Sequence, residues 1–175
     1  MQLIKVLRLG HRIERDKRIT THCALVARAF GANEIILSGE KDAAILESVK
    51  KVCLKWGGGF KISYEPAFSS FLRKQKRLGF KIVHLTMYGE EFFKRVPAIK
   101  KEKKIVLVIG SQKVPPIVYQ LADYNVSVGS QPHSEVAALS ILLYSLRGKK
   151  YLYRHFGGLT IVGSNGKKIF SPAKR

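Results

Sequence analysis

Short apolar segments alternate with segments of helical periodicity along most of this chain, and no other feature constrains its fold as much. Residues 3–9, 34–38 and 104–109 are rich in apolar and β-branched side chains, and a glycine follows each of them. Nearly continuous apolar strands are typical of parallel sheets whose crossover helices cover both faces. We therefore predict an α/β fold built on a mostly parallel sheet that is covered on both faces.

The expected elements follow one another without a linker, repeat or low-complexity stretch. The expected strands span 3–9, 34–38, 60–64, 80–86, 104–109 and 124–128. The expected helices span 20–29, 42–56, 66–78, 90–95, 115–122 and 133–146. Two further strands within 159–170 flank Ser164-Asn165-Gly166, which is a hairpin signal. Residues 1–175 should thus form one domain, with residues 155–175 as a C-terminal hairpin extension.

The charge of the chain limits its partners. Lysine and arginine number 32 against 12 acidic residues, which gives a net charge of +20 and favours a nucleic-acid partner. A solvated surface would mix both signs, but after Glu102 the acidic residues are Asp123 and Glu135 alone. A membrane surface is less favoured, and no apolar run reaches the roughly 18 residues of a membrane span. The charged N-terminus and the two dispersed cysteines, Cys23 and Cys53, predict a cytoplasmic protein with reduced thiols.

Four basic clusters stand out, and one of them differs in kind. It contains Arg8, Arg12, Arg15, Lys17 and Arg18, and we expect it in a loop at the carboxyl end of the first strand. Parallel sheets present ligands at that edge, and the arginine fork suits phosphate groups. The lysine-rich clusters, such as Lys100, Lys101, Lys103 and Lys104, are by themselves typical of a solvated face. Tyr151 and Tyr153 could stack on bases, although packing of the tail is favoured.

Several chemistries are disfavoured. The sequence contains neither a G-x-G-x-x-G after a strand nor a G-x-x-x-x-G-K-[ST] phosphate loop. The five histidines are dispersed and no H-x-x-x-H or C-x-x-C occurs, so no metal site is expected. Ser134 lies between His133 and Glu135, but adjacent helical residues point in different directions, which argues against a hydrolytic triad.

Motifs in the second half of the chain resemble those of a known superfamily. Leu107-Val-Ile-Gly-Ser-Gln112 and Asn125-Val-Ser-Val128 resemble the second and third motifs of the SPOUT RNA methyltransferases. Leu7-Arg-Leu-Gly-His-Arg12, Thr20-Thr21-His22 and Gly129-Ser-Gln-Pro-His-Ser-Glu-Val-Ala137 are similar to the archaeal tRNA ribose 2′-O-methyltransferases that modify cytidine-56. The resemblance implies a trefoil-knotted fold, a homodimer, and S-adenosylmethionine as the metal-free methyl donor.

The same resemblance implies the site residues. The cofactor would lie against three loops that contain Leu85, then Gly110, Ser111, Gln112, Lys113 and Val114, then Val128, Gly129, Ser130, Gln131, Pro132, His133, Ser134 and Glu135. Asn125 could equally contact the cofactor or make a hydrogen bond at a strand end.

The chain departs from the family pattern at two positions. Gln112 replaces a glutamate of the second motif, and Leu25 replaces an arginine of the first helix. An arginine from the preceding cluster could compensate, with Arg18 and Arg15 as the first candidates and Arg12 and Arg8 next. Because a guanidinium stays charged, its expected role is to hold a phosphate and stabilise developing alkoxide charge.

RNA contacts are expected from Arg8, Lys100, Lys101 and Lys103. Two alternatives remain open at this point. One is a SPOUT enzyme acting on another tRNA or rRNA nucleotide, and the other is a non-catalytic basic RNA-binding module.

Overall fold

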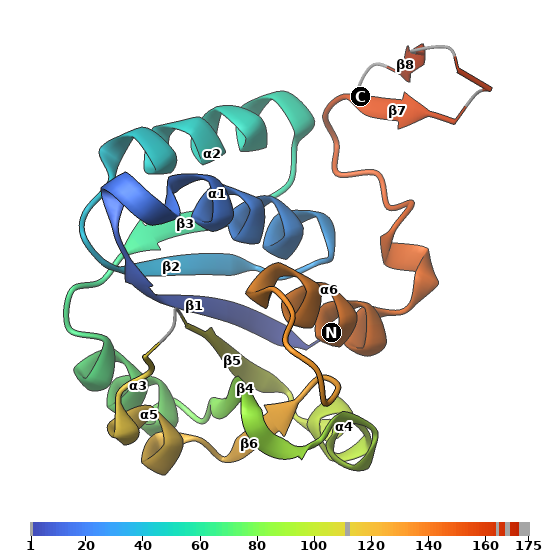
Figure 1. The fold of residues 1–175 in the computed structure, drawn as a ribbon. Helices are drawn as coiled ribbons and strands as arrows, with labels where there is room; N and C mark the ends of the chain where they lie inside the picture. Colours follow the sequence, from blue (N-terminus) through green and yellow to red (C-terminus); the bar gives the residue numbers. More distant parts are fainter. Residues whose placement is uncertain (1, 111–112, 164, 167–168, 172–175) are drawn as a thin grey trace.

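Six parallel strands form one sheet in the computed structural model, which describes residues 2–110, 113–163, 165–166 and 169–171 (Figure 1). The strands are β1 (Leu3–His11), β2 (Glu34–Gly39), β3 (Lys61–Tyr64), β4 (Lys81–Glu91), β5 (Lys104–Ile109) and β6 (Tyr124–Ser127). Their order across the sheet is β3-β2-β1-β5-β4-β6. The predicted parallel α/β architecture is confirmed.

Helices cover both faces of this sheet. They are α1 (Ile13–Ala29), α2 (Ala43–Trp56), α3 (Phe68–Arg77), α4 (Phe92–Lys101), α5 (Pro116–Leu121) and α6 (Glu135–Arg147), and a 3-10 turn η1 (Lys149–Tyr151) follows. Side chains alternate between two cores: Ile105 and Leu107 of β5 pack with α1, α2, α4 and α6, whereas Val106 and Val108 pack with α3 and α5. The strands therefore read as continuous apolar runs because both of their faces are buried.

The first helix begins seven residues earlier than Thr20, where the sequence predicted its start. The side chain of its N-cap residue, Arg12, makes no capping hydrogen bond. Instead, Asp16 Oδ2 accepts a hydrogen bond from the Arg12 amide at 3.2 Å, and Glu40 Oε2 accepts one from the Ile13 amide at 2.7 Å. Arg15, Lys17 and Arg18 consequently lie on α1, and the expectation that they form a loop is wrong.

The fourth helix also extends beyond the expected range of 90–95. It continues to Lys101 and includes Pro97 in its interior. Phe92, Val96 and Ile99 on its buried face hold it against the sheet. Lys100 and Lys101 therefore end a helix, and Lys103 directly precedes β5.

The C-terminal hairpin is confirmed as two antiparallel strands, β7 (Thr160–Val162) and β8 (Ile169–Ser171). Figure 1 shows it standing apart from the sheet at the end of the segment that leaves α6. Ser164, in the turn of this hairpin, lies outside the described residues.

The trefoil knot stays a prediction. Among the described residues, no helix is both long and apolar enough to cross a membrane.

Candidate active site

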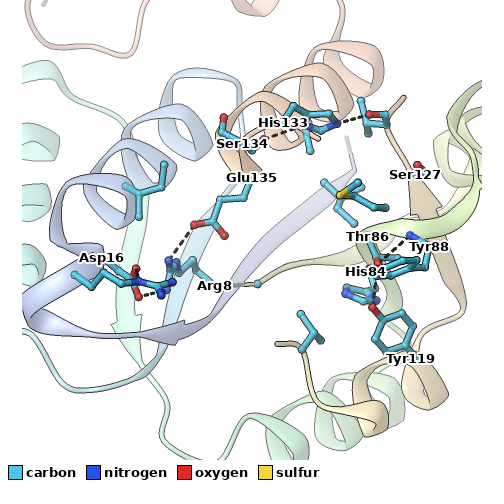
Figure 2. A pocket seen from close by; sticks show the side chains of 18 residues that line it. Arg8, Asp16, His84, Thr86, Tyr88, Tyr119, Ser127, His133, Ser134 and Glu135 are labelled. Carbon is cyan, nitrogen blue, oxygen red and sulfur yellow. Dashed lines mark hydrogen bonds and ion pairs between the residues drawn. The ribbon is translucent and has the colours of Figure 1, made fainter. Parts of the chain in front are cut away.

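A cavity of about 530 Å³ opens at the carboxyl ends of β1, β4, β5 and β6, beside the first turns of α1 and α6. This is the edge at which parallel sheets bind ligands. Its lining residues are Arg8, Arg15, Asp16, Ile19, His84, Leu85, Thr86, Met87, Tyr88, Gly110, Val114, Tyr119, Ser127, Val128, His133, Ser134, Glu135 and Ala138 (Figure 2). A volume of this size, with apolar walls and a few polar groups, is typical of a small-molecule site.

One wall of the cavity is a bulge in β4. Leu85 and Glu90 both pair with Val126 of β6, so residues 86–89 leave the regular ladder. Gly89 is required there, since a Cβ would lie 2.5 Å from the Val126 backbone. Thr86 Oγ1 accepts a hydrogen bond from the Tyr88 amide at 3.3 Å and shares another with the Tyr119 hydroxyl at 3.0 Å. The bulge holds Tyr88 at the cavity, where this residue is 87% exposed.

Opposite the bulge, Arg8 forms a buried ion pair with Glu135. Figure 2 shows the Glu135 carboxylate pointing toward the Arg8 guanidinium. Arg8 is 1% exposed, and its Nη2 donates to Glu135 Oε1 at 2.9 Å. Arg8 Nη1 also donates to the Leu9 carbonyl at 3.0 Å and lies 3.8 Å from Asp16 Oδ2. This pair joins the end of β1 to the start of α6. Arg8 is buried in the cavity wall rather than exposed on the surface, and its contact with RNA stays a prediction.

Asp16 is the centre of a set of arginines. Its Oδ1 accepts from Arg15 Nε at 3.0 Å, and its Oδ2 accepts from Arg12 Nε at 3.4 Å. Burial would raise the pKa of Asp16, but the hydrogen bonds and charges of Arg15, Arg8 and Arg12 bring it below its ordinary value. Asp16 therefore stays ionised and fixes the direction of the Arg15 guanidinium at the cavity.

Glu135 responds differently to the same surroundings. Burial raises its pKa, and the charge of Arg8 only partly opposes this. Its Oε2 is buried and has no hydrogen-bond partner among the described residues. An unpartnered carboxylate oxygen in the wall of a cavity is an acceptor suited to a ligand donor.

The first turn of α6 forms the rim. Ser134 is its N-cap, and its Oγ accepts from the Ala137 amide at 3.2 Å. His133 Nδ1 contacts the Ser134 carbonyl at 3.1 Å, and its Nε2 is hydrogen-bonded to the Val128 carbonyl. These bonds tie the loop after β6 to the helix and give Ser134 a capping role.

His84 lies on the floor of the cavity and is fully buried. Its Nδ1 donates to Asn125 Oδ1 at 2.9 Å, while Nε2 has no partner among the described residues. Asn125 also donates from Nδ2 to the Tyr119 carbonyl at 3.2 Å, so it makes the strand-end hydrogen bonds that the sequence left as one of two options. Burial lowers the pKa of His84 despite the bond to Asn125.

This environment predicts a loss of stability in mild acid. The unfolded chain takes up the imidazole proton near the ordinary pKa of 6.5, whereas the folded protein resists it until a lower pH. Between these values the unfolded state binds more protons, so the free energy of unfolding should fall as pH falls below about 6.5. His84→Gln should flatten this slope, as measured by denaturant unfolding at several pH values. An equal slope in the variant would contradict this role of His84.

The structure gathers only part of the predicted cofactor set. Leu85, Gly110, Val114, Val128, His133, Ser134 and Glu135 line the cavity. Lys113, Gly129, Ser130, Gln131 and Pro132 are described but do not line it. Ser111 and Gln112 lie outside the described residues.

Of the predicted catalytic arginines, Arg15 lines the cavity, whereas Arg12 and Arg18 do not. Arg12 has its exposed side chain on Asp16, and Arg18 is exposed one turn farther along α1. Arg8 also lines the cavity, but it is 1% exposed and paired with Glu135, whereas Arg15 is exposed, so this geometry favours Arg15 among the candidate arginines.

Sequence reasoning missed the residues of the β4 bulge and its neighbours. Thr86, Met87, Tyr88 and Tyr119 all line the cavity. The signal that could have found them is the end of the apolar run at Leu85, followed four residues later by Gly89. Among the described residues, no group of three or more histidine, cysteine, aspartate or glutamate side chains could hold a metal ion.

Sequence comparisons connect this geometry with known enzymes. Residues 56–170 match a family model described as tRNA ribose 2′-O-methyltransferase, aTrm56. The tRNA (cytidine(56)-2′-O)-methyltransferase of Thermococcus kodakarensis is 51% identical over 175 residues, which cover 96% of this chain and 97% of that one. The relative of the same name from Methanocaldococcus jannaschii is 49% identical and covers 95% of both chains.

Solved structures share the fold at low sequence identity. The TrmH/SpoU tRNA modifying enzyme of A. aeolicus has a TM-score of 0.65 at 19% identity, over 84% of this chain and 75% of that one. An AdoMet-bound rRNA methyltransferase from Sinorhizobium meliloti has a TM-score of 0.61 at 22% identity. It matches over 83% of this chain and 56% of its own length, and at this identity the likeness concerns the fold alone.

Proposed function

Because this chain belongs to the tRNA ribose 2′-O-methyltransferase family, we propose that it transfers a methyl group from S-adenosylmethionine to the 2′-hydroxyl of cytidine-56 in tRNA. The observation that carries the proposal from family to site is the cavity at the carboxyl ends of β1, β4, β5 and β6. It contains residues of all three loops that the family motifs assign to the cofactor.

The residues present fit this cofactor. Leu85, Met87, Val114 and Val128 offer apolar contacts to an adenine ring, and Glu135 Oε2 offers an unpartnered acceptor. A Cβ at Gly110 would lie 2.4 Å from Val114 Cγ2, so a side chain there would require Val114 to move, and the bare glycine backbone can approach a ligand closely. S-Adenosylmethionine supplies a methyl group on a positively charged sulfur.

The protein contributes mainly position and charge. The transfer forms a bond between the ribose 2′-oxygen and the methyl carbon and breaks the bond between that carbon and sulfur. The hydroxyl proton leaves to the neighbouring RNA phosphate. Arg15, held by Asp16, binds that phosphate and stabilises the negative charge that develops on the oxygen. The buried pair of Arg8 and Glu135 keeps β1 and α6 in register around the cofactor.

A single assay tests the function. The protein is incubated with methyl-labelled S-adenosylmethionine and unmodified tRNA, with and without a chelator, and the labelled nucleoside is identified. We expect 2′-O-methylcytidine at position 56, with no loss on chelation. Label at another nucleotide would favour the alternative SPOUT enzyme. Cofactor-independent tRNA binding without transfer would favour a non-catalytic RNA-binding module.

Lysines at the amino edge of the sheet should contribute to tRNA affinity rather than to turnover. Lys100, Lys101 and Lys103 are exposed at the end of α4 and before β5, opposite the cavity edge. Replacing them with alanine should reduce the slope of log affinity against log salt by about one unit per lost phosphate contact. Filter binding over a salt series measures the slope. An unchanged slope, or a lower kcat at saturating tRNA, would contradict the assignment.

We further propose a cytoplasmic homodimer. Ile141 and Tyr144 on the outer side of α6 are exposed, as are the large apolar residues Ile161 and Phe170 of the hairpin. Apolar surface of this kind is a candidate for burial against a second copy. Light scattering at micromolar concentration should give twice the 19.7 kDa chain mass. A mass of one chain would contradict the dimer.

A further inference from the structure

A second, smaller cavity of about 220 Å³ lies at the opposite edge of the sheet. Its walls include Asn33 and Phe60, which precede β2 and β3, together with the end of α1 and the segment after η1. None of the residues that line the first cavity takes part in it. The methyl-transfer mechanism makes no use of this cavity.

Arg28 is the buried cation of this second cavity. It is 8% exposed, and its Nη2 donates to the Gly57 carbonyl at 2.6 Å. Its Nε is buried with no hydrogen-bond partner among the described residues. The guanidinium carbon lies 5.1 Å from the centre of the Phe156 ring. A buried charge normally has an ionic partner, so this arginine indicates a missing anion.

Two more arginines, Arg147 and Arg154, lie close to the Tyr151 ring in the wall of this cavity. The guanidinium carbon of Arg154 lies 5.0 Å from the Tyr151 ring centre and 5.6 Å from that of Phe156, and Arg147 lies 5.1 Å from Tyr151. Burial lowers the pKa of Arg147; Tyr151 partly opposes this, and the charge of Arg154 lowers it further. No acidic residue lines the cavity, and no ion pair involves these three arginines in the described part of the chain. Aromatic faces attract cations but carry no net negative charge to balance them.

Uncharged donors complete the lining. His155 Nδ1 accepts a hydrogen bond from the Gly157 amide at 3.0 Å, which places the ring proton of the neutral imidazole on Nε2. Gly58 and Gly59 are both exposed; Phe156 Cδ1 lies 3.1 Å from a Cβ position at Gly58, and Gly59 has no heavy atom within 4 Å of one. Exposed glycine backbone beside fixed cations is a common way to bind an anion.

From this arrangement we propose that the second cavity binds a phosphate group, and that this phosphate belongs to the backbone of the tRNA. The second half of the proposal rests on the proposed function. The small volume suits one phosphate better than a whole nucleotide. The exposed Lys149, Lys150 and Tyr153 continue the surface beside it and offer charge and a stacking face to a polynucleotide.

The position of the cavity limits which phosphate it can contact. The nine residues of β1 span roughly 30 Å at about 3.3 Å per residue, and the two cavities lie at opposite ends of such strands. The bound phosphate therefore lies several nucleotides away from the methylated ribose. The enzyme would in this way recognise a folded tRNA rather than the target loop alone.

Arg154→Ala tests the proposal, because Arg154 is exposed whereas Arg28 anchors the Gly57 carbonyl. Lys51→Ala is the control, since Lys51 is exposed on α2 and lines neither cavity. In one arm, inorganic phosphate is titrated into isotope-labelled protein and the amide signals of Gly58 and Gly59 are followed. In the other arm, tRNA affinity is measured over a salt series.

We expect saturable phosphate shifts at both glycines that excess tRNA abolishes. Arg154→Ala should weaken phosphate binding at least tenfold and reduce the salt slope for tRNA by about one unit, and Lys51→Ala should leave phosphate binding unchanged. Absence of the phosphate shifts in the folded wild type would overturn the site. Phosphate shifts that tRNA does not displace, with an unchanged slope in Arg154→Ala, would overturn the tRNA assignment. Both arms are independent of methyl transfer, so a failed nucleoside assay is distinguishable from a failed phosphate site.

Discussion

Arg15→Ala should lower kcat for methyl transfer about 10²- to 10³-fold while S-adenosylmethionine binding and the fold are preserved. Arg15 lines the cavity, and Asp16 fixes it through the 3.0 Å bond to Nε. A cation placed at the reacting phosphate acts on charge that develops in the transition state, so its removal affects turnover more than ground-state binding. Single-turnover transfer at saturating tRNA measures this effect, and calorimetry measures cofactor affinity.

Arg18→Ala is the matched control for that experiment. Arg18 lies three residues farther along α1, carries the same charge and is exposed outside the cavity lining. It should lose tRNA affinity without a comparable loss of kcat. If Arg18→Ala lost turnover and Arg15→Ala did not, the catalytic assignment would pass to Arg18. An equal loss in both variants would contradict a separate role for either residue.

The sheet and most of its helices could be predicted because their signals are local. An apolar strand such as residues 104–109 is recognisable from its own composition, and the capping serine of α6 precedes the helix it caps. The start of α1 could not be predicted in this way. Its first amides are bonded by Asp16 inside the helix and by Glu40, which lies 27 residues beyond Ile13.

The candidate site was predictable in outline and not in detail for the same reason. The loops after β5 and β6 carry recognisable motifs, and Gly110, Val128 and Glu135 from them line the cavity. The β4 bulge depends on the register between β4 and β6, which places Leu85 and Glu90 opposite one residue. The end of the apolar run at Leu85 and the later Gly89 mark an interruption of the strand, but they do not encode that register.

Arg8 shows how a long-range contact can reverse an interpretation. In the sequence it belongs to an exposed basic cluster, but its partner Glu135 lies 127 residues away. Once that carboxylate is in place, the arginine can be buried at the end of β1. The structure gives this arginine a role in joining two walls of the cavity, which its place in a basic cluster did not indicate.

Removing Glu135 should therefore destabilise the protein strongly. In Glu135→Gln the side chain keeps its shape but leaves Arg8, which is 1% exposed, with Asp16 at 3.8 Å as its remaining ionic partner. Breaking one side of a buried ion pair costs about 3–5 kcal/mol of unfolding free energy. Denaturant unfolding at neutral pH measures the loss.

The double variant Arg8→Met/Glu135→Leu separates charge from packing. Because it removes both desolvated charges, it should recover most of the stability that Glu135→Gln loses, as apolar replacements of buried ion pairs often do. Cofactor affinity should stay low in the double variant even where stability recovers, since Glu135→Leu removes the Oε2 acceptor at the cavity. A loss below about 0.5 kcal/mol in Glu135→Gln would show that solvent or Asp16 already satisfies Arg8. A double variant less stable than the single one would show that the pair contributes through its own attraction rather than by avoiding an unpaired buried charge.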